Sequence, residues 1–329
     1  MLAAKVLQEQ DIEVTGVSFT SNFFNAEKAR KAAEQIGIKL KTVDISQEIL
    51  ELVKNPPSGH GKNLNPCVDC HALMMKKAGE IAKKEKYDFI ATGEVLGQRP
   101  FSQNRQALDK IMKLADVEVL RPLSSKLLPE TEIEKKGLID RNKLLDISGR
   151  TRERQMKMAK KFGLEEYPSP AGGCLLTDPA FSLRLKAMIE HWPECTVEDV
   201  EILKYGRIFW LSFKNDVGNF PVLLIIGRNQ AENEVLEKLA KKGDFMVELR
   251  KITGPLALTR IKNYELKIKN FEDNLKIFIP EKLETEKLNS SALEFNDLRE
   301  LIIKVGAIAG YYSTKARGKA AELTIKMNS

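Results

Sequence analysis

Cysteines are the residues of this chain whose type and spacing most clearly suggest chemistry. Cys67 and Cys70 form a Cys-x-x-Cys pair directly before a stretch with helical spacing, and Cys174 follows two glycines in the proline-rich loop 167–174. The amino end of a helix lowers the pKa of a nearby thiol and so favours the thiolate, the form that attacks electrophiles and binds metals. The pair is therefore predicted to be a functional site, with two inert cysteines as the competing interpretation.

Three kinds of site use such a pair: a thioredoxin-like redox centre, half of a zinc site, or part of an iron–sulfur cluster. A redox pair ordinarily follows a strand directly, whereas here the long loop 55–66 precedes the pair, and this disfavours the redox interpretation. A zinc site with His60 or His71 stays open, although neither histidine completes a standard paired spacing.

Cys174 is expected over the same sheet edge as the pair, because both segments follow elements of one domain. Three thiolates can hold a 4Fe-4S cluster with one iron left open for an external ligand, although ligation by four cysteines is commoner. Cys195 is the candidate fourth ligand, but it lies in the predicted linker, where a lone buried cysteine is the favoured interpretation.

The elements that must position these cysteines alternate between helix and strand in the first half of the chain. Strands are predicted at 14–19, 39–45 and 87–92, and helices at 25–36, 71–84, 129–136, 151–162 and 180–192. This alternation predicts a parallel sheet covered on both faces, with its functional side at the carboxyl ends of the strands. A helix at 1–10 precedes the first visible strand, so we expect an amino-terminal strand to be missing.

In the second half of the chain, most of the predicted strands follow one another without a helix between them. Strands are predicted at 208–213, 222–226, 245–249, 264–268, 275–279 and 321–327, and helices at 229–241 and 296–311. The pattern indicates an α+β domain, and the boundary between the two halves is expected near residues 180–204.

One loop of the first half suits a nucleotide. Residues 91–94, Ala-Thr-Gly-Glu, end a predicted strand and run into a loop containing Gly97, Gln98, Ser102 and Gln103. Sheets of this kind contact nucleotides at such strand ends, although an ordinary turn has the same composition.

Composition excludes several classes of protein. The chain has 329 residues, 43% hydrophobic and 30% charged, which is typical of a soluble globular protein rather than a disordered or fibrous one. The longest aliphatic run, 222–226, is far too short to cross a bilayer, and no secretory signal opens the chain, so we expect a cytoplasmic protein without a membrane anchor.

The net charge of +7 is concentrated in two stretches. Residues 149–161 contain six basic side chains against a single acidic one, and residues 301–329 are also basic. A solvated surface is the plain interpretation of either stretch, and binding to a polyanion is the functional one.

Two sets of motifs in residues 1–178 resemble tRNA-thiolating enzymes. Residues 91–98, with Ser102, Gln103 and the Val-Leu-Arg-Pro-Leu run 119–123, resemble the ATP-pyrophosphatase domain of tRNA 4-thiouridine synthases. The Asn-Pro-Cys-Val-Asp-Cys run 65–70 together with Gly-Gly-Cys 172–174 is similar to the two cysteine loops of the tRNA 2-thiouridylases. The resemblance implies an adenine nucleotide alpha-hydrolase-like (PP-loop) fold that uses ATP with Mg²⁺ to adenylate a uridine of tRNA before sulfur displaces AMP.

The resemblance also implies roles for individual residues. Cys70 and Cys174 match the paired catalytic cysteines, and Cys67 completes the three-cysteine set of members that use a 4Fe-4S cluster, so all three are expected to be catalytic and metal-ligating. Adenine contacts are expected at Phe19 and Thr20, and second-loop contacts at Gly93, Gln98 and Gln103. The sulfur donor would be sulfide or a cysteine desulfurase.

One feature of that family is absent from the 329 residues: the Ser-Gly-Gly-x-Asp-Ser phosphate loop between the first strand and first helix. A truncated amino end and a genuine loss of ATP hydrolysis both explain this, and we favour truncation because the downstream loops are intact. Residues 1–329 alone are expected to bind ATP poorly.

Motifs of the carboxyl half resemble the RNA-binding domain of the NFACT proteins of ribosome-associated quality control. They lie at 226–233, 239–244, 252–255 and 309–317, in the family's order. The resemblance implies RNA contacts from Arg228, Asn229, Arg250, Lys315 and Arg317, with Tyr311 or Tyr312 stacking on a base, although both tyrosines are equally suited to the core.

These observations predict a thiolation domain at 1–178, a linker helix at 179–203 and an RNA-binding domain at 204–329. The leading hypothesis is an ATP-dependent tRNA sulfurtransferase, with 4-thiouridine slightly favoured over 2-thiouridine as product and with Arg150, Arg152, Arg154 and Lys157 touching the tRNA backbone. The alternatives are a non-catalytic RNA-binding protein with a degenerate nucleotide fold and another adenylating ligase or amidotransferase. The latter would not need three cysteines.

Overall fold

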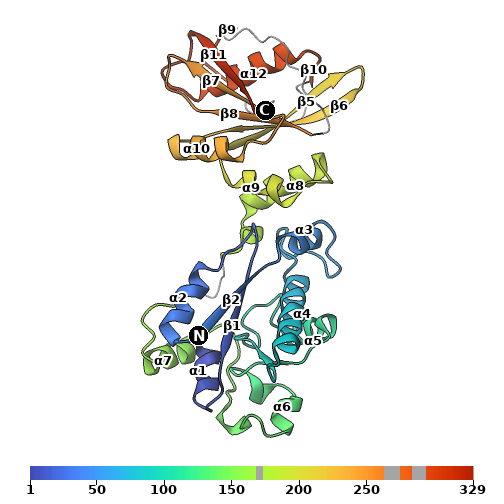
Figure 1. The fold of residues 1–329 in the computed structure, drawn as a ribbon, viewed down its shortest axis with the longest axis vertical. Helices are drawn as coiled ribbons and strands as arrows, with labels where there is room; N and C mark the ends of the chain where they lie inside the picture. The colour runs from blue at the N-terminus through green and yellow to red at the C-terminus, as the bar shows by residue number, and fades with distance from the viewer. Residues whose placement is uncertain (168–172, 263–274, 284–293, 329) are drawn as a thin grey trace. The chain divides into compact units, whose positions relative to one another are not determined.

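The structure, a computed structural model, describes residues 1–167, 173–262, 275–283 and 294–328. The chain forms two compact units, Met1–Ser182 and Leu183–Ser329, which we describe separately (Figure 1). Helix α8 (Pro179–His191) contains the division between them. No helix in the described ranges is long and apolar enough to span a bilayer.

The first unit alternates helices and strands. In chain order its elements are α1 (Leu2–Gln8), β1 (Thr15–Thr20), α2 (Glu27–Ile36), β2 (Lys39–Asp44), α3 (Ser46–Lys54), α4 (Cys67–Glu85), β3 (Ile90–Ala91), α5 (Arg105–Ala115), β4 (Val119–Leu120), α6 (Glu132–Lys135), α7 (Glu153–Lys161) and the start of α8. Short 3-10 helices cover Ser125–Leu127, Arg141–Lys143 and Leu175–Thr177.

The strands of this unit form two separate parallel pairs. β1 pairs with β2 from Thr15 opposite Lys39 to Thr20 opposite Asp44, and β3 pairs with β4. The predicted parallel pairing is confirmed, but no described strand joins the two pairs into the continuous sheet that we expected. Interior strands of parallel sheets are usually buried on both faces. Every residue of β1 is only half-buried, which agrees with a strand that is not in the interior of a larger sheet.

Helix α1 carries the main core of the first unit. Its Val6 and Leu7 are almost completely buried in a cluster that includes Leu120 of β4 and, partly buried, Val14 just before β1. A smaller cluster packs Ala159 of α7 against α1 and α2. Because these helices bury apolar faces against both strand pairs, the carboxyl ends of β1 and β3 are held in one unit.

Two helices of the first unit were missed from the sequence, α3 and α5. The start of α5 carries a recognisable signal, because the side chain of Asn104 accepts a hydrogen bond from the amide of Ala107 and caps the helix. Helix α4 was predicted to begin at residue 71 but begins at Cys67. The two cysteines therefore lie in its first turn rather than before it.

The second unit is built on a sheet in which most neighbours are antiparallel. Its elements after α8 are α9 (Val197–Glu201), a 3-10 helix (Ile202–Lys204), β5 (Arg207–Asn215), β6 (Gly218–Ile226), α10 (Gln230–Leu239), β7 (Phe245–Arg250), β8 (Ala257–Ile261), β9 (Leu275–Phe278), β10 (Glu294–Phe295), α12 (Leu298–Tyr311) and β11 (Ala320–Met327). The order of the described strands is β10-β5-β6-β8-β7-β11-β9, and among these the β10–β5 pair alone is parallel. This arrangement agrees with the predicted α+β domain.

Helix α12 packs on one face of this sheet, where its Leu301, Val305 and Ile308 are completely buried. The other face carries Trp210, whose ring lies 4.9 Å from that of Trp192 at the end of α8. Strand β8 was missed from the sequence, and the strand predicted at 264–268 lies outside the described residues.

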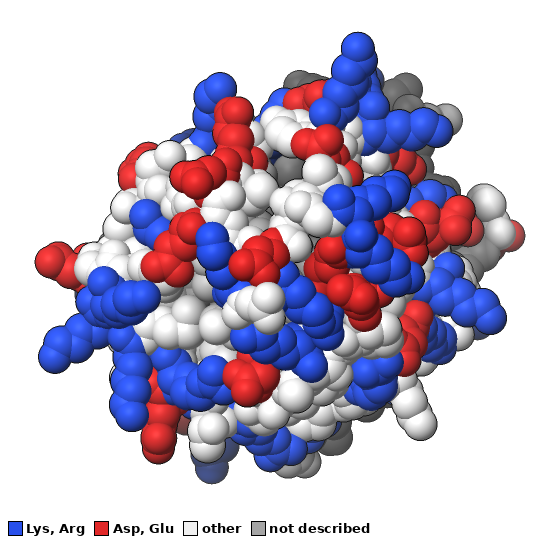
Figure 2. Space-filling model, turned by 90° about the horizontal axis from the view of Figure 1, so that it is seen from below, with Lys and Arg blue, Asp and Glu red and all other residues white. Residues whose placement is uncertain are grey.

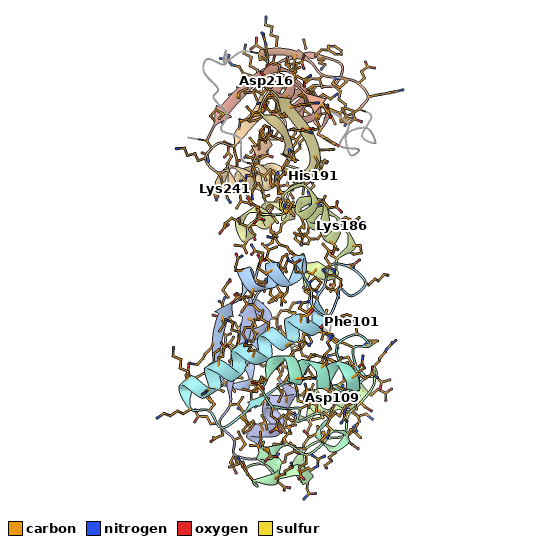
Figure 3. All side chains as sticks on the ribbon, turned by 90° about the vertical axis from the view of Figure 1, so that its right-hand side faces the viewer. Phe101, Asp109, Lys186, His191, Asp216 and Lys241 are labelled. Carbon is orange, nitrogen blue, oxygen red and sulfur yellow. The ribbon has the colours of Figure 1, made fainter. Side chains whose placement is uncertain are left out.

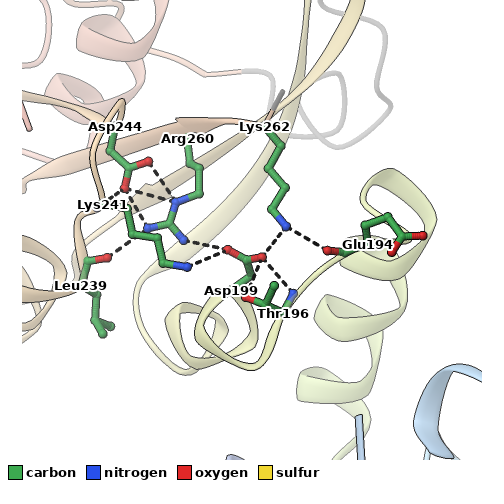
Figure 4. Close-up of polar contacts among 8 residues, drawn as sticks. All are labelled: Glu194, Thr196, Asp199, Leu239, Lys241, Asp244, Arg260 and Lys262. Atoms are coloured by element: carbon green, nitrogen blue, oxygen red, sulfur yellow. Dashed lines mark hydrogen bonds and ion pairs between the residues drawn. The ribbon is translucent and has the colours of Figure 1, made fainter. Parts of the chain in front are cut away.

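A buried ion-pair network fastens α9 to the sheet (Figure 4). Arg260 on β8 pairs with Asp244 at 2.7 Å and with Asp199 of α9 at 3.3 Å. Lys241 and Lys262 also pair with Asp199. Although burial raises the pKa of Asp199, the hydrogen bond from Lys262 and the charge of Lys241 outweigh it and lower that pKa to about 2. Asp199 is therefore ionised at neutral pH.

Candidate active site

The Cys-x-x-Cys pair is held by the loop that precedes α4. Asp69, which lies between the two cysteines in the sequence, is buried. Its carboxylate accepts hydrogen bonds from the backbone amide of Ser58 at 2.9 Å and from the Ser58 hydroxyl at 2.6 Å. The side-chain amide of Asn65 donates to the Cys67 sulfur at 3.1 Å. These contacts fold the loop back onto the first turn of α4 and fix the position of both thiols.

Two hydrogen bonds bring the Cys174 segment to the same place. The side-chain amide of Asn63 donates to the carbonyl of Thr177 at 2.8 Å, and the amide of Leu175 donates to the carbonyl of Phe23 at 2.9 Å. Cys174 is thereby held between the loop before α4 and the turn after β1. The structure thus brings together Cys67, Cys70 and Cys174, as predicted from the order of the elements.

The pKa values of Cys70 and Cys174 are both raised. Burial raises the pKa of the Cys70 thiol well above its ordinary value, and the nearby Cys174 and Cys67 raise it further. Burial likewise raises the pKa of Cys174 to about 11, and Cys67 contributes to that rise. The prediction that the helix end favours a thiolate is therefore wrong for Cys70, because burial and the neighbouring Cys174, Cys67 and Asp69 raise its pKa.

The two histidines considered for a zinc site have other hydrogen-bond partners. Among the described residues, no three or more His, Cys, Asp or Glu side chains are already arranged to hold a metal ion. The ring of His60 contacts the carbonyl of Val53 at 2.9 Å, and His71 contacts Glu94 at 2.9 Å. Both the zinc site and the iron–sulfur cluster therefore stay predictions.

Cys195 is the candidate fourth ligand. It lies in the second unit and is 2% exposed, and its amide donates to the carbonyl of Trp192 at 2.9 Å. This placement agrees with the favoured interpretation, a lone buried cysteine.

The residues predicted to contact adenine end the first strand. Phe19 and Thr20 are the last two residues of β1, opposite Val43 and Asp44 of β2. The carbonyl of Thr20 accepts from the amide of Ile45 at 2.9 Å. Both residues thus lie at the carboxyl edge of the β1–β2 pair, where nucleotides bind to parallel strands.

Gly93, Gln98 and Gln103 lie in the loop that follows β3. Gly93 is exposed, and a Cβ at this position would meet no atom within 4 Å. The amide of Gly97 donates to the carbonyl of Gln103 at 2.7 Å and closes the loop, whose Phe101 side chain is exposed (Figure 3). The side-chain oxygen of Gln103 is buried and has no hydrogen-bond partner, so it is a free acceptor.

A buried chain of charged groups links this loop to the cysteine helix, and sequence reasoning did not single it out. Glu94 contacts the His71 ring at 2.9 Å with one carboxylate oxygen and the Arg121 guanidinium at 3.1 Å with the other. Although burial raises the pKa of Glu94, the His71 hydrogen bond and the Arg121 charge outweigh it and lower that pKa. The carboxylate thus ties α4 to the ends of β3 and β4.

The basic stretch 149–161 adjoins the nucleotide loop. The amide of Gly149 donates to the carbonyl of Leu96 at 2.8 Å, and the backbones of the two loops are in close contact there. Arg150 and Lys157 are exposed, Arg152 is half-buried at the start of α7, and Arg154 pairs with Asp146 at 2.7 Å. Basic and acidic side chains are interspersed on the face drawn in Figure 2, so the charge is not an unbroken basic surface there.

Of the residues of the second unit that are predicted to contact RNA, some have a local hydrogen-bond or ion-pair partner and others are exposed. Arg228 pairs with Glu232, and Asn229 caps α10 by accepting from the amide of Glu232 at 3.0 Å. Both side chains therefore have a local structural partner. Arg250 is exposed at the end of β7, and Lys315 is exposed after α12.

Arg317 belongs to a cluster of two arginines and two tyrosines, the Arg–Tyr cluster. Its guanidinium lies 4.4 Å from the ring centre of Tyr311, and Arg207 of β5 lies 4.4 Å from that of Tyr312. The two rings are 5.4 Å apart. Tyr312 also packs against the core, whereas Tyr311 is not among the residues packed there. No sequence pattern points to Arg207, because it precedes both tyrosines by more than 100 residues.

Comparisons with known proteins bear on the first unit. Residues 2–135 match the family model described as "Thiamine biosynthesis protein (ThiI)". The "tRNA-specific 2-thiouridylase MnmA" of Sulfurimonas denitrificans (strain ATCC 33889 / DSM 1251) is 33% identical over 107 residues, which cover 29% of this chain and 31% of that relative. The match thus spans about a third of the relative's length, and no solved structure matches. Both findings support the predicted likeness to tRNA-thiolation proteins, and the family match does not reach the second unit.

Proposed function

We propose that the protein is an ATP-dependent tRNA sulfurtransferase that adenylates a uridine and replaces its carbonyl oxygen with sulfur. The observation that carries the proposal is the convergence of Cys67, Cys70 and Cys174 in the unit that also holds the nucleotide loop. Adenylation converts a poor leaving oxygen into AMP, and a thiol-bound sulfur is a suitable nucleophile to displace it. We favour 4-thiouridine slightly over 2-thiouridine as the product.

In this proposal the three cysteines hold a 4Fe-4S cluster. Thiols with raised pKa values are protonated at neutral pH, and cluster assembly would deprotonate them, because a bound cation stabilises thiolates. When bound, the cluster would supply an open iron to carry sulfide. Asp69 and Asn65 hold Cys67 and Cys70 in place for either a cluster or a two-cysteine persulfide route.

The proposal assigns ATP with Mg²⁺ to the loops at the ends of β1 and β3. Phe19 and Thr20 would contact adenine, while Gly93, Gln98 and Gln103 would line the second loop. The open space at Gly93 and the unpartnered oxygen of Gln103 support this assignment. The Ser-Gly-Gly-x-Asp-Ser run expected for the phosphates is not among the 329 residues, so no phosphate contact is assigned here.

RNA contact is assigned to both units. In the first unit Arg150 and Lys157 are the best placed of the predicted residues, because both are exposed. In the second unit the Arg–Tyr cluster offers aromatic rings beside fixed positive charge, a combination that stacks on unpaired bases. Arg250 and Lys315 would add charge that attracts the phosphate backbone, so binding is expected to weaken as salt rises.

The test of this function is the tRNA of a strain that lacks the gene. Mass spectrometry of its nucleosides should show the loss of one thiouridine, and the wild-type gene should restore it. Genes with Cys67→Ser, Cys70→Ser or Cys174→Ser should fail to restore it, whereas the Cys195→Ser control should succeed. Unchanged thiouridines in the deletion strain would refute the proposal. If Cys67→Ser alone stays active, the persulfide route is the correct one.

A non-catalytic RNA-binding protein is the second candidate. It is favoured by the Arg–Tyr cluster, which does not depend on the cysteines. This candidate predicts that the purified chain binds tRNA in a gel-shift assay while the deletion strain keeps all of its thiouridines.

A further inference from the structure

A groove of about 450 Å³ opens on the first unit, between α7 and the segment that follows this helix. Its volume is in the range of pockets that hold small ligands, about 300–1,000 Å³. The side chains that line the groove come from one face of α7 and from residues 164–167: Met156, Lys157, Lys160, Leu164, Glu165 and Tyr167. The groove is separate from the three cysteines and from the nucleotide loop after β3.

A glycine turn at the end of α7 creates the groove. Gly163 has φ of +65°, and its amide donates to the carbonyl of Lys160 at 3.1 Å. The amide of Leu164 donates to the carbonyl of Ala159 at 2.9 Å, which completes the usual glycine cap of a helix and turns the chain back along α7. Leu164 is buried with Ala159 and Ile36 and closes the bottom of the groove.

The second wall of the groove is held by α2. The side-chain amide of Gln35 lies against the backbone of Glu165 and Glu166. In the orientation that satisfies both of its groups, it donates to the Glu166 carbonyl at 2.8 Å and accepts from the Glu165 amide at 2.9 Å. Both walls are thus fixed by backbone contacts, so the groove is already formed in the free chain.

Two large apolar side chains of the groove face solvent. Met156 is 50% exposed and Tyr167 is 40% exposed. Single exposed apolar residues are common on protein surfaces, but here an aromatic ring and a thioether line one groove. A flat ring and a polarisable sulfur are suited to contact a flat apolar partner.

The charged groups of the groove favour an anionic partner. Lys157 and Lys160 are both exposed, and neither forms an ion pair with any residue that the structure describes. Glu165 is the single acidic residue of the lining, so two positive charges oppose one negative charge. The rest of the basic stretch 149–161 adds positive charge around the groove.

We propose that this groove, the α7 groove, binds an unpaired nucleotide of single-stranded RNA. The base stacks on the ring of Tyr167 beside Met156, and Lys157 and Lys160 contact the flanking phosphates. An acidic peptide would satisfy the lysines, but its carboxylate side chains offer no flat apolar surface to the tyrosine ring. That the natural RNA is the tRNA substrate rests on the proposed function.

The experiment measures how RNA protects individual lysines of the full chain from acetylation. The protein is treated with an acetylating ester at increasing concentrations of a single-stranded oligouridylate, and peptide mass spectrometry gives the acetylation rate of each lysine. RNA should slow the acetylation of Lys157 and Lys160, and this protection should weaken as the salt concentration rises. Lys110, an exposed lysine of α5, is the control and should react at an unchanged rate. Because the readout is local, RNA bound to the second unit does not obscure it.

Substitutions of the tyrosine test the stacking contact. Tyr167→Leu should raise the RNA concentration that half-protects the two lysines by about fivefold or more, because stacking on an aromatic ring is lost. Tyr167→Phe keeps the ring and should retain most of the protection. The control Tyr87→Leu alters a tyrosine of similar exposure, 38%, and should have no effect.

Three results would overturn the proposal. The first is equal protection of Lys110 or no protection of the two groove lysines. The second is a Tyr167→Leu variant that binds like the wild type or like Tyr87→Leu. The third is protection by oligoglutamate with the same dependence on Tyr167, which would identify an acidic protein segment as the partner.

The acetylation measurement is independent of the proposed sulfur chemistry, because it uses neither ATP nor a sulfur donor. If the deletion strain loses a thiouridine but RNA does not protect the groove, the α7 groove is wrong and the proposed function stands. If RNA protects the groove but the thiouridines are unchanged, the proposed function fails and the groove remains an RNA-binding site.

Discussion

At the scale of single residues, burial decides the state of the cysteines. Cys70 lies in the first turn of α4, where the helix dipole favours a thiolate, yet its pKa is raised. Burial raises the pKa of Cys70 and of Cys174, and the proximity of other thiols raises both further. The free chain therefore keeps these thiols protonated and relies on a bound cation or on basic conditions to activate them.

The pKa of Cys174 leads to a kinetic prediction. Because it is raised to about 11, the rate constant for alkylation by iodoacetamide in the metal-free protein should rise about tenfold per pH unit from pH 7.5 to 9.5. Free cysteine, the reference, should approach its plateau above its ordinary pKa of about 8.5. Mass spectrometry of the peptide 162–184 measures the rate. A plateau for Cys174 near pH 8.5 would contradict the predicted burial of this thiol.

The carboxylate of Glu94 should be important for stability as well as for position. Glu94→Gln would leave the guanidinium of Arg121 buried without its counter-ion, which typically costs about 3–5 kcal/mol. Urea unfolding of the first unit, followed by hydrogen exchange and mass spectrometry, measures the loss. The control Glu132→Gln breaks an exposed pair with Lys135 and should leave the unfolding free energy unchanged. Equal stability of both variants would contradict the network.

At the scale of elements, α12 lies close to the sheet because it presents glycines to it. A Cβ on Gly306 would come within 2.4 Å of a Leu323 methyl group, and one on Gly310 within 2.1 Å of an Ile279 methyl group. Neither glycine has a positive φ, so they are required by space rather than by backbone conformation. These close contacts determine the distance between the sheet and α12, the helix that carries Tyr311.

Gly310→Ala should therefore destabilise the second unit. The added methyl group overpacks a closed core, and such changes typically cost about 1–3 kcal/mol. Ile279→Val removes the opposing methyl group and should recover part of the loss in the double variant. Glu300→Ala, on the exposed part of the same helix, is the control. Urea unfolding followed by tryptophan fluorescence measures all four proteins, and additive losses in the double variant would refute direct contact.

At the scale of the whole molecule, the two units differ in what stabilises them. The first has clusters packed around α1 and buried polar contacts, and the second has a large core on one face of a sheet with seven described strands. Both tryptophans of the chain, Trp192 and Trp210, lie in the second unit. Tryptophan fluorescence therefore reports on that unit alone.

Acid should destabilise the second unit through Asp199. Its pKa is lowered to about 2 in the folded chain, below the ordinary value of about 3.9. A lowered pKa contributes stability that is fully present above pH 4 and is lost as the pH falls through 2, on the order of 2 kcal/mol. Urea unfolding at pH 5, 4, 3 and 2 measures it by fluorescence. Asp199→Asn should remove this part of the pH dependence, whereas the exposed control Asp216→Asn should not (Figure 3).

Much of this protein could be predicted from local patterns in the sequence. A helix was predicted at 25–36, and in the structure α2 ends at Ile36 and is followed by Gly37 with φ of +68°. The parallel pairing of β1 with β2 and the approach of Cys174 to Cys67 and Cys70 followed from the order of the elements. These features depend on periodicity, on turn residues and on strand direction, all of which short stretches of sequence contain.

Only the tertiary structure decided which distant groups meet. Asn63 binds the carbonyl of Thr177, Glu94 joins His71 to Arg121, and Arg207 reaches Tyr312, and none of these contacts has a spacing that a sequence can reveal. The raised thiol pKa values belong to the same class, because they depend on how much water the fold excludes. The sequence by itself determined which residues could do chemistry, whereas packing determined the charge and the neighbours with which they would do it.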